Sequence, residues 1–194
     1  MDRGEIAIRP IVAADASTVA DLHATSWKHA YRGMLRDEYL DADVAGDRRQ
    51  AWAARLGAPV ESDFGFIAEA AGDAVGFVFV CGRADDAWGP LIDNLHVLPG
   101  LTGRGIGRRL LEAAALETAR RYPGEPVHLF VFEANVDARR FYTGVGGREV
   151  EHSTVETPGG GSQVRWRVVW DDAERLRAGA RSAPRSTAGR AEAD

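Results

Sequence analysis

The chain has 194 residues, of which 45% are hydrophobic and 27% charged, and its formal net charge is −5. A chain of this length can fill one hydrophobic core, so one domain is expected. The negative net charge argues against nucleic acid as a partner, because general nucleic-acid binding needs a basic face.

Membrane and metal partners are not expected either. No apolar run approaches the roughly 18 residues that a membrane span needs, and the first residues lack the apolar core of a signal peptide. A cytoplasmic location is therefore predicted. The single cysteine, Cys81, excludes an internal disulfide and a paired-cysteine zinc site. The histidines show no ligand spacing, so no metal site is predicted.

The first third of the chain is expected to hold one strand and two helices. A short strand is predicted over residues 6–9. Asp15 or Ser17 is suited to cap a helix that continues to about Ala30. A stretch rich in acidic and aromatic residues follows at 34–44, and residues 47–56 have a helical pattern.

The middle of the chain changes to the pattern of strands. Residues 64–69 and 75–80 are predicted to pair as a hairpin around the turn Ala71-Gly-Asp73. A third apolar run covers residues 91–97. The three runs predict an antiparallel meander.

A glycine-rich turn, Pro99-Gly-Leu-Thr-Gly-Arg-Gly-Ile-Gly-Arg108, joins this third run to a helix. Its glycines leave room for backbone N–H groups to converge on an anion at the positive end of the helix dipole. A plain turn is the alternative. A dinucleotide-binding unit would place the glycines after the first strand of a repeating strand-helix pattern, and a P-loop would continue as Gly-Lys-Ser/Thr. Neither fits, so the turn predicts a phosphate site of another kind.

The last part of the chain alternates helix and strand. The helix after the glycine turn ends before Pro123, and the continuous apolar run 127–132 is typical of a buried central strand. A second helix begins near Asn135 and ends before Gly146. Strands are predicted over 148–155 and 163–170. Residues 172–194 contain few large apolar side chains and are expected to form a disordered tail after a domain over 1–171.

The order of these elements and two motifs resemble the GNAT superfamily of acetyl-CoA-dependent N-acetyltransferases over about residues 5–170. The family block Arg/Gln-x-x-Gly-x-Gly/Ala is matched by Thr102-Gly-Arg-Gly-Ile-Gly107. The block Asn-x-x-Ala-x-x-Phe-Tyr is matched by Asn135-Val-Asp-Ala-Arg-Arg-Phe-Tyr142. Two motifs in this order are more specific than either alone. The chain departs from the family at Thr102, where Arg or Gln is usual, and at Gly147, where Phe is usual.

The resemblance implies an α+β fold with a mixed, mostly antiparallel central sheet of six to seven strands, flanked by about four helices. It also implies that the sheet opens between the strands 91–97 and 127–132 to hold the pantetheine arm of acetyl-CoA, and that backbone groups of the glycine turn bind the pyrophosphate. Asn135 is suited to the pantetheine arm or to capping its helix. The residues that the resemblance assigns to the cofactor are Leu95, His96, Val97, Gly103, Arg104, Gly105, Ile106, Gly107, Arg108, Asn135 and Tyr142.

Acetyl transfer from a thioester to an amine needs a neutral amine, support for the developing oxyanion and a proton for the departing thiolate. A backbone N–H of residues 95–97 would hold the oxyanion. Tyr142 fits the proton role, although a core position beside Phe141 is the alternative. A phenol titrates near 10 and a thiol near 8.5, so full proton transfer from Tyr142 would cost roughly 2 kcal/mol. We therefore expect Tyr142 to share the proton in a hydrogen bond.

Family members often take the general base from positions that correspond here to Leu91 and Asp93. Leu91 cannot accept a proton. By strand alternation Asp93 shares a face with Leu91 and Leu95, which makes it the candidate base, directly or through water. It is also suited to binding the substrate ammonium or a backbone group. His96 is expected on the opposite face with a structural role.

The acceptor pocket is expected between the first two helices, the strand 91–97 and the last hairpin. Trp27 and Tyr31, together with Asp93, are the candidate substrate-binding residues, because aromatic faces accept cationic amines. Helix packing is the alternative. The acidic residues of 37–47 would suit a cationic acceptor or would simply be solvated.

The predicted function is transfer of acetyl from acetyl-CoA to a primary amine of a small molecule by direct attack. Leu91 and Thr102 leave open a non-catalytic acyl-CoA sensor. The same chemistry on a protein N-terminus or lysine is a third interpretation. Dimers are common in the family, so a second copy of the chain, in a homodimer, is one partner that the resemblance implies.

Overall fold

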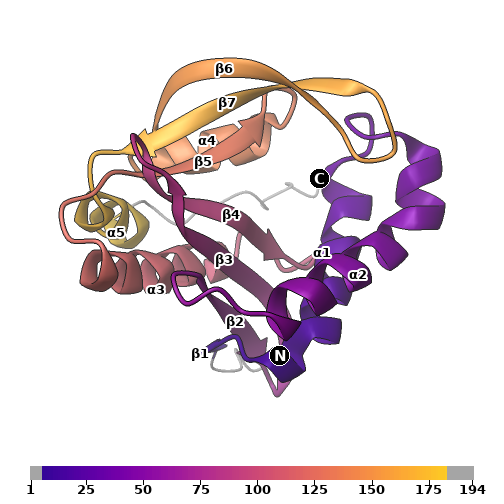
Figure 1. The fold of residues 1–194 in the computed structure, drawn as a ribbon, viewed down its shortest axis with the longest axis horizontal. Coiled ribbons are helices and arrows are strands. Elements are labelled where there is room, and N and C mark those ends of the chain that lie inside the picture. Colours follow the sequence, from indigo (N-terminus) through magenta and orange to yellow (C-terminus); the bar gives the residue numbers. More distant parts are fainter. Residues whose placement is uncertain (1–5, 183–194) are drawn as a thin grey trace, which may run out of the picture.

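The computed structural model describes residues 6–182 and forms one seven-stranded sheet with helices on both faces (Figure 1). The strands are β1 (Ile6–Pro10), β2 (Phe64–Ala70), β3 (Asp73–Asp85), β4 (Gly89–Val97), β5 (Val127–Phe132), β6 (Arg148–Glu156) and β7 (Ser162–Trp170). The helices are α1 (Ala16–Ala30), α2 (Val44–Gly57), α3 (Ile106–Arg121), α4 (Val136–Gly144) and α5 (Ala173–Ser182). A 3-10 turn at Ala13–Asp15 and a π-helical turn, η2, at Tyr39–Asp43 precede α1 and α2.

The strand order is β1-β2-β3-β4-β5-β7-β6, and β4 and β5 are the parallel pair of an otherwise antiparallel sheet. The predicted α+β class with six to seven mostly antiparallel strands is therefore confirmed. The described residues form five α-helices where about four were predicted. None of the helices in this part of the chain has the length and hydropathy needed to cross a membrane.

Alternating side chains of β3 divide the core into two layers. Val78 and Val80 lie in the cluster that includes α3 and α5, whereas Phe77 and Phe79 lie in the cluster formed with α1 and α2. Both sets are buried because a central strand is covered on both faces. In Figure 1 the pairs α3/α5 and α1/α2 lie on opposite sides, and the β6–β7 hairpin arches above the opening part of the sheet.

Strands β4 and β5 pair at one point and then diverge. Leu91 and His128 are their one register pair in the described chain, although β4 continues to Val97 and β5 to Phe132. The facing edges of both strands beyond this pair lack the ladder that closes the rest of the sheet. The opening predicted between these strands is present.

A β-bulge interrupts β4 beside this opening. Val80 pairs with Ile92 and Phe79 pairs with Asn94, so Asp93 is an extra residue without a partner on β3. A bulge shifts the alternation of side chains by one position and leaves backbone groups outside the ladder.

The bulge makes one half of the predicted facing of Asp93 wrong: Asp93 shares the α1/α2 face with Leu91, which pairs with Cys81, but not with Leu95. Leu95 packs toward the α3 layer, whereas the Asp93 carboxylate contacts Arg55 of α2. Asp93 and Leu95 therefore lie on opposite faces. His96, expected on the face opposite Asp93, lies with it on the α1/α2 side, where its ring contacts His23.

The chain after Trp170 continues into helix α5, contrary to the predicted disordered tail. Ala173, Leu176 and Ala180 are buried in the α3 layer of the core. These positions recur at helical spacing, so a narrow apolar stripe holds an otherwise polar helix in place. Residues 183–194 of the predicted tail lie outside the described residues.

The predicted cap of α1 also differs. Asp15 stands at the N-cap position, but its carboxylate accepts hydrogen bonds from Arg9 at 2.7 and 2.8 Å and from the backbone N–H of Val12 at 2.8 Å. It caps the preceding turn and ties β1 to the start of α1. The Arg9 guanidinium lowers the pKa of Asp15.

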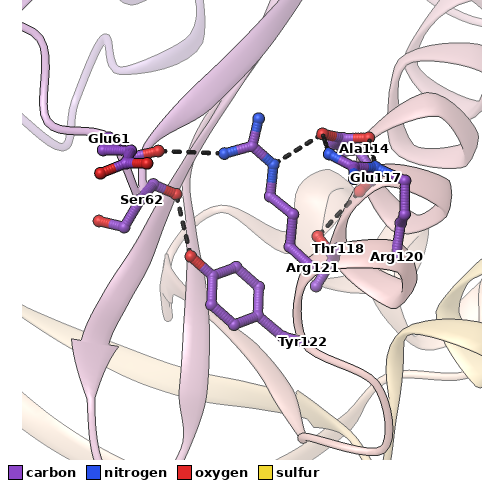
Figure 2. Close-up of polar contacts among 8 residues, drawn as sticks. All are labelled: Glu61, Ser62, Ala114, Glu117, Thr118, Arg120, Arg121 and Tyr122. Carbon is purple, nitrogen blue, oxygen red and sulfur yellow. Dashed lines mark hydrogen bonds and ion pairs between the residues drawn. The ribbon is translucent and has the colours of Figure 1, made fainter.

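A polar clamp fixes the C-terminal end of α3 (Figure 2). Arg121 donates to Glu117 at 2.6 Å and to the carbonyl oxygen of Glu61 at 3.1 Å, and Tyr122 donates its hydroxyl to the carbonyl oxygen of Ser62 at 3.1 Å. The segment before β2 is thereby attached to the C-terminal end of the helix that carries the glycine turn.

Candidate functional site

The glycine turn forms an uncapped N-terminus at α3. Gly103 and Gly105 have φ values of 76° and 84°, which residues with a side chain rarely adopt. A Cβ at either position would enter open space. Gly105 is the N-cap residue, and no side chain caps the helix. The first N–H groups of a helix have no intrahelical partner, so this end is suited to an anion. Arg104 is exposed and Arg108 half-buried beside it.

Gly107 has a different role from the other two glycines. A Cβ there would lie 3.7 Å from the ring of Phe141 and 3.8 Å from Val97. The glycine therefore lies at the close approach of α3 to α4 and to the end of β4. This contact joins the two sequence motifs in space.

Tyr142 and Tyr31 approach each other from opposite faces of the sheet. Tyr142 of α4 packs beside Phe141 and 6.4 Å from the ring of Trp170, in the α3 layer. Tyr31 belongs to α1, and its ring lies 5.3 Å from Phe132 at the end of β5. Burial raises the pKa of Tyr142 well above its ordinary value, and proximity to Tyr31 raises it further. Burial also raises the pKa of Tyr31 to about 12.

A tyrosine hydroxyl is protonated at neutral pH even at its ordinary pKa, and the raised pKa of Tyr142 stabilises the protonated form further. The hydroxyl is then a hydrogen-bond donor and a worse source of a free proton than an ordinary phenol. The raised pKa makes complete proton donation less favourable, and the sharing of a proton by Tyr142 stays a prediction.

Asp93 is held by two side chains. Arg55 donates to its carboxylate at 2.7 Å, and the amide of Asn94 donates to the same oxygen at 2.7 Å. Arg55 also lies over the rings of Trp52 and Phe79, which fixes the guanidinium. Both donors bind Oδ2, which leaves Oδ1 to accept from a donor group of a ligand.

His96 belongs to a buried pair of histidines. Its Nδ1 lies 3.0 Å from the hydroxyl of Ser26, and its ring centroid lies 4.5 Å from that of His23. Trp52 donates to Nδ1 of His23 at 2.9 Å. Burial lowers the pKa of His96 to about 3 and that of His23 well below its usual range, with Arg48 contributing in both cases. Both imidazoles are therefore neutral at pH 7, and the structural role of the His96 side chain stays a prediction.

Asn135 caps α4. Its side-chain oxygen accepts from the backbone N–H of Ala138 at 3.2 Å. The capping interpretation is therefore confirmed, and the predicted contact of Asn135 with the pantetheine arm stays a prediction.

The rings of Trp27 and Tyr31 pack against each other, as a shared place in the predicted acceptor pocket requires. Their centroids are 5.3 Å apart, and Trp27 also lies 4.8 Å from His23. The Arg48 guanidinium covers the Trp27 ring at 4.5 Å. The indole N–H of Trp27 is buried without a hydrogen-bond partner in the described chain. Arg48 and Phe132 were not among the predicted site residues.

Acidic side chains of residues 37–47 form contacts with residues close to them in the sequence. Asp37 and Asp41 form ion pairs with Arg32, and Asp47 accepts from the hydroxyl of Tyr39 at 2.7 Å. Asp37 and Asp41 share one guanidinium, and the Tyr39 hydroxyl carries no charge, so the stretch keeps a net negative charge.

The departure at Gly147 has a packing explanation. A Cβ at Gly147 would lie 2.7 Å from the indole of Trp170 and 2.5 Å from Val168. Trp170 is 1% exposed and donates its indole N–H to the carbonyl oxygen of Val145 at 3.0 Å. The indole occupies the space beside residue 147, so a side chain at this position has no room.

Comparison with known proteins assigns the family. Residues 22–146 match the Acetyltransferase (GNAT) family. An uncharacterized N-acetyltransferase of Archaeoglobus fulgidus is 38% identical over 90 residues, which span 42% of this chain and 58% of that relative. The similarity thus covers little more than half of that protein's length.

Two solved structures share the fold. A GCN5-related N-acetyltransferase from Rhodopseudomonas palustris matches with a TM-score of 0.68 and 24% identity, over 87% of this chain and 97% of that one. The PaiA N-acetyltransferase of Thermoplasma acidophilum, in complex with coenzyme A, matches with a TM-score of 0.65 and 20% identity, over 85% and 98% of the two chains. These two structures share the fold of the chain, including its order of strands and helices.

The chain belongs to the Acetyltransferase (GNAT) family. The family predicted from the two sequence motifs is thereby confirmed.

Proposed function

We propose that the protein transfers the acetyl group of acetyl-CoA to the primary amine of a small-molecule acceptor by direct attack. The observation that carries the proposal is the opening between β4 and β5, with Tyr142 on one face and Tyr31 on the other, next to the uncapped N-terminus of α3. The coenzyme A complex of the similar Thermoplasma protein supports the choice of cofactor.

The residues of the opening fit acetyl-CoA. Backbone N–H groups from Gly103 to Arg108 would hold the pyrophosphate, with the Arg104 side chain nearby, even though Thr102 replaces the usual basic or amide side chain. The unpaired edge of β4 at residues 95–97 would hold the pantetheine arm through backbone groups. These N–H groups also support the oxyanion that develops at the thioester carbonyl.

Two side chains have proposed roles in the transfer. Tyr142 donates a hydrogen bond to the departing thiolate and keeps most of its proton, because its pKa is raised. Asp93, paired with Arg55, holds the acceptor's ammonium group on the α2 side of the sheet. In this arrangement the amine loses its proton to water before attack. Trp27 and Tyr31 would form the aromatic wall of the acceptor site.

The test uses Tyr142→Phe with Tyr122→Phe as the matched control. Tyr122 also carries a hydrogen-bonded hydroxyl, but it belongs to the clamp at the far end of α3. Thiol release from acetyl-CoA is measured against a panel of amines, and acetyl-CoA affinity by isothermal titration. Tyr142→Phe should lower turnover about tenfold or more, within the usual contribution of a positioned proton donor, and leave affinity nearly unchanged.

Unchanged turnover in Tyr142→Phe would remove the proposed role of this hydroxyl. Binding of acetyl-CoA without thiol release on any amine would support the sensor interpretation. Turnover on peptides but on no small amine would support a protein acceptor. Absence of acetyl-CoA binding by the unaltered protein would refute the proposed function as a whole.

A further inference from the structure

Arg165 of β7 lies on the acceptor side of the sheet. It pairs across the ladder with Phe132 of β5, and paired residues of an antiparallel ladder point to the same face. The Phe132 ring contacts Tyr31 of α1 at 5.3 Å. Arg165 therefore shares the face that carries α1 and α2, on which Asp93 also lies.

The Arg165 guanidinium is held in place without a carboxylate. It lies 3.7 Å from the centroid of the Phe130 ring, and its Nε donates to the Ser153 hydroxyl at 3.3 Å. Within the described residues it forms no ion pair. The residue is half-buried, and burial together with Arg167 lowers its pKa.

Arg167 provides the contrast on the same strand. Its guanidinium lies 4.6 Å from the same Phe130 ring, yet it donates to Glu151 at 2.6 Å and lies 3.5 Å from Asp85. The nearby carboxylates are thus engaged by Arg167. Two cations on one aromatic ring repel each other, and Arg165 lacks a partner to offset this repulsion.

Other acidic groups around this face are also engaged. Asp93 is bound by Arg55, Asp37 and Asp41 are bound by Arg32, and Asp47 of α2 accepts from the Tyr39 hydroxyl. An acceptor therefore meets one carboxylate with a cation partner, at Asp93, and two guanidinium groups that form no ion pair within the described residues: Arg165, and Arg48 over the Trp27 ring. This combination is complementary to a molecule with both an amine and a negative charge.

We propose that Arg165 binds an anionic group of the acceptor, so that the acceptor is an amine that also carries a carboxylate or a phosphate. The assignment rests on the proposed acetyl transfer and narrows its substrate class. A guanidinium accepts both anions through paired N–H donors, and its position over Phe130 pre-orders that fork. Amino acids and aminoalkyl phosphates are the two sources of this chemistry.

The test compares matched acceptors that differ in the anion alone. The twenty amino acids are assayed beside their amides, and phosphoethanolamine beside ethanolamine, with thiol release from acetyl-CoA as the readout. An amino-acid amide has the less basic amine, so more of it is neutral at the assay pH. Intrinsic reactivity therefore favours the amide, and a preference for the acid must come from the protein.

The variant Arg165→Gln keeps a polar side chain, although a shorter one, and removes the charge. It should raise KM for the anionic acceptor about tenfold or more, as expected for loss of a hydrogen bond to a charged group, with kcat and the KM of the amide little changed. Arg165→Lys should restore part of the preference. Arg120→Gln is the control, because Arg120 is exposed at the end of α3. Circular dichroism and acetyl-CoA affinity verify that each variant is folded.

Equal use of acids and amides by the unaltered protein would overturn the inference, as would an acid preference that survives Arg165→Gln. Acetyl-CoA binding without turnover of any member of either series would also overturn it. If the protein acetylates only amines that lack an anionic group, the proposed function stands and the proposed class of anionic acceptors is refuted. A preference for phosphoethanolamine over the amino acids would identify phosphate as the anion.

Discussion

The close packing around Gly147 makes a quantitative prediction for Gly147→Ala. The new Cβ would lie 2.5 Å from Val168, 2.7 Å from Trp170 and 3.0 Å from the carbonyl oxygen of Tyr142. Both side chains are buried, so neither can swing into solvent. Overpacking of this kind costs about 1–3 kcal/mol. Gly147 is not among the described glycines with positive φ, so the backbone itself accepts alanine.

The opposing effect is smaller. Replacing glycine by alanine at a compatible backbone position stabilises a protein by about 0.4–1 kcal/mol, because the unfolded chain loses freedom. The clash therefore prevails, and Gly147→Ala should lower the free energy of unfolding by about 1–2 kcal/mol. For a chain of this size the melting temperature should fall by roughly 2–8 °C.

Urea unfolding and calorimetry of Gly147→Ala and Gly144→Ala provide the measurement. Gly144 is the last residue of α4, and a Cβ there would meet no atom within 4 Å. The same substitution without the clash should leave Gly144→Ala as stable as the unaltered protein or slightly more stable. A Gly147→Ala protein that melts at or above the unaltered temperature would refute the packing explanation of this position.

Two further predictions concern α3. Gly105→Ala should weaken acetyl-CoA binding about tenfold or more in isothermal titration. Gly100→Ala is the control, because its φ of 79° is similar to the 84° of Gly105 and alanine is strained to a comparable degree there, yet it should retain affinity. Equal losses of affinity in the two variants would place the cofactor elsewhere. Hydrogen bonds from Arg120 and then Arg121 lower the pKa of Glu117 to about 2 from 4.5, so the stability contributed by Glu117 is present above pH 4.5 and lost as the pH falls toward 2. Because the pair is partly exposed, Glu117→Gln should cost only about 1 kcal/mol at pH 7, and urea unfolding should show this difference shrinking between pH 5 and 2; a difference that does not change with pH would contradict the assignment.

The strands and the cofactor turn were predictable because their signals are local. Alternation, apolar runs and glycine turns identify all seven strands, six of them within two residues of their observed ends, whereas β3 continues five residues beyond its predicted end at Val80. The two motifs identify the family because the required residues of each lie within one short stretch of the sequence. None of these signals depends on contacts between distant segments.

The face of Asp93 was not predictable in this way. Alternation assumes one residue per ladder position, and the bulge at Asp93 breaks this assumption without a glycine or proline to mark it. Helix α5 did carry a signal, since Ala173, Leu176 and Ala180 follow helical spacing. The signal was weak because two of these three residues are small and the rest of the segment is polar.

Arg165 was missed for a different reason. Its position over Phe130 depends on the antiparallel pairing of β5 with β7, which brings together residues 35 positions apart in the sequence. Nothing near Arg165 in the sequence distinguishes it from Arg167, which has carboxylate partners. The difference arises only when the sheet is assembled.

The opening between β4 and β5 also bears on how stable the protein is. Beyond Leu91 and His128, no hydrogen-bonded ladder joins β4 to β5. The proposed cofactor would supply contacts there that the chain alone does not make. A ligand that binds only the folded state adds about 2.7 kcal/mol to stability at one hundred times its Kd. Under the proposed function, resistance to unfolding would follow the concentration of acetyl-CoA, and the unliganded protein would represent its lower limit.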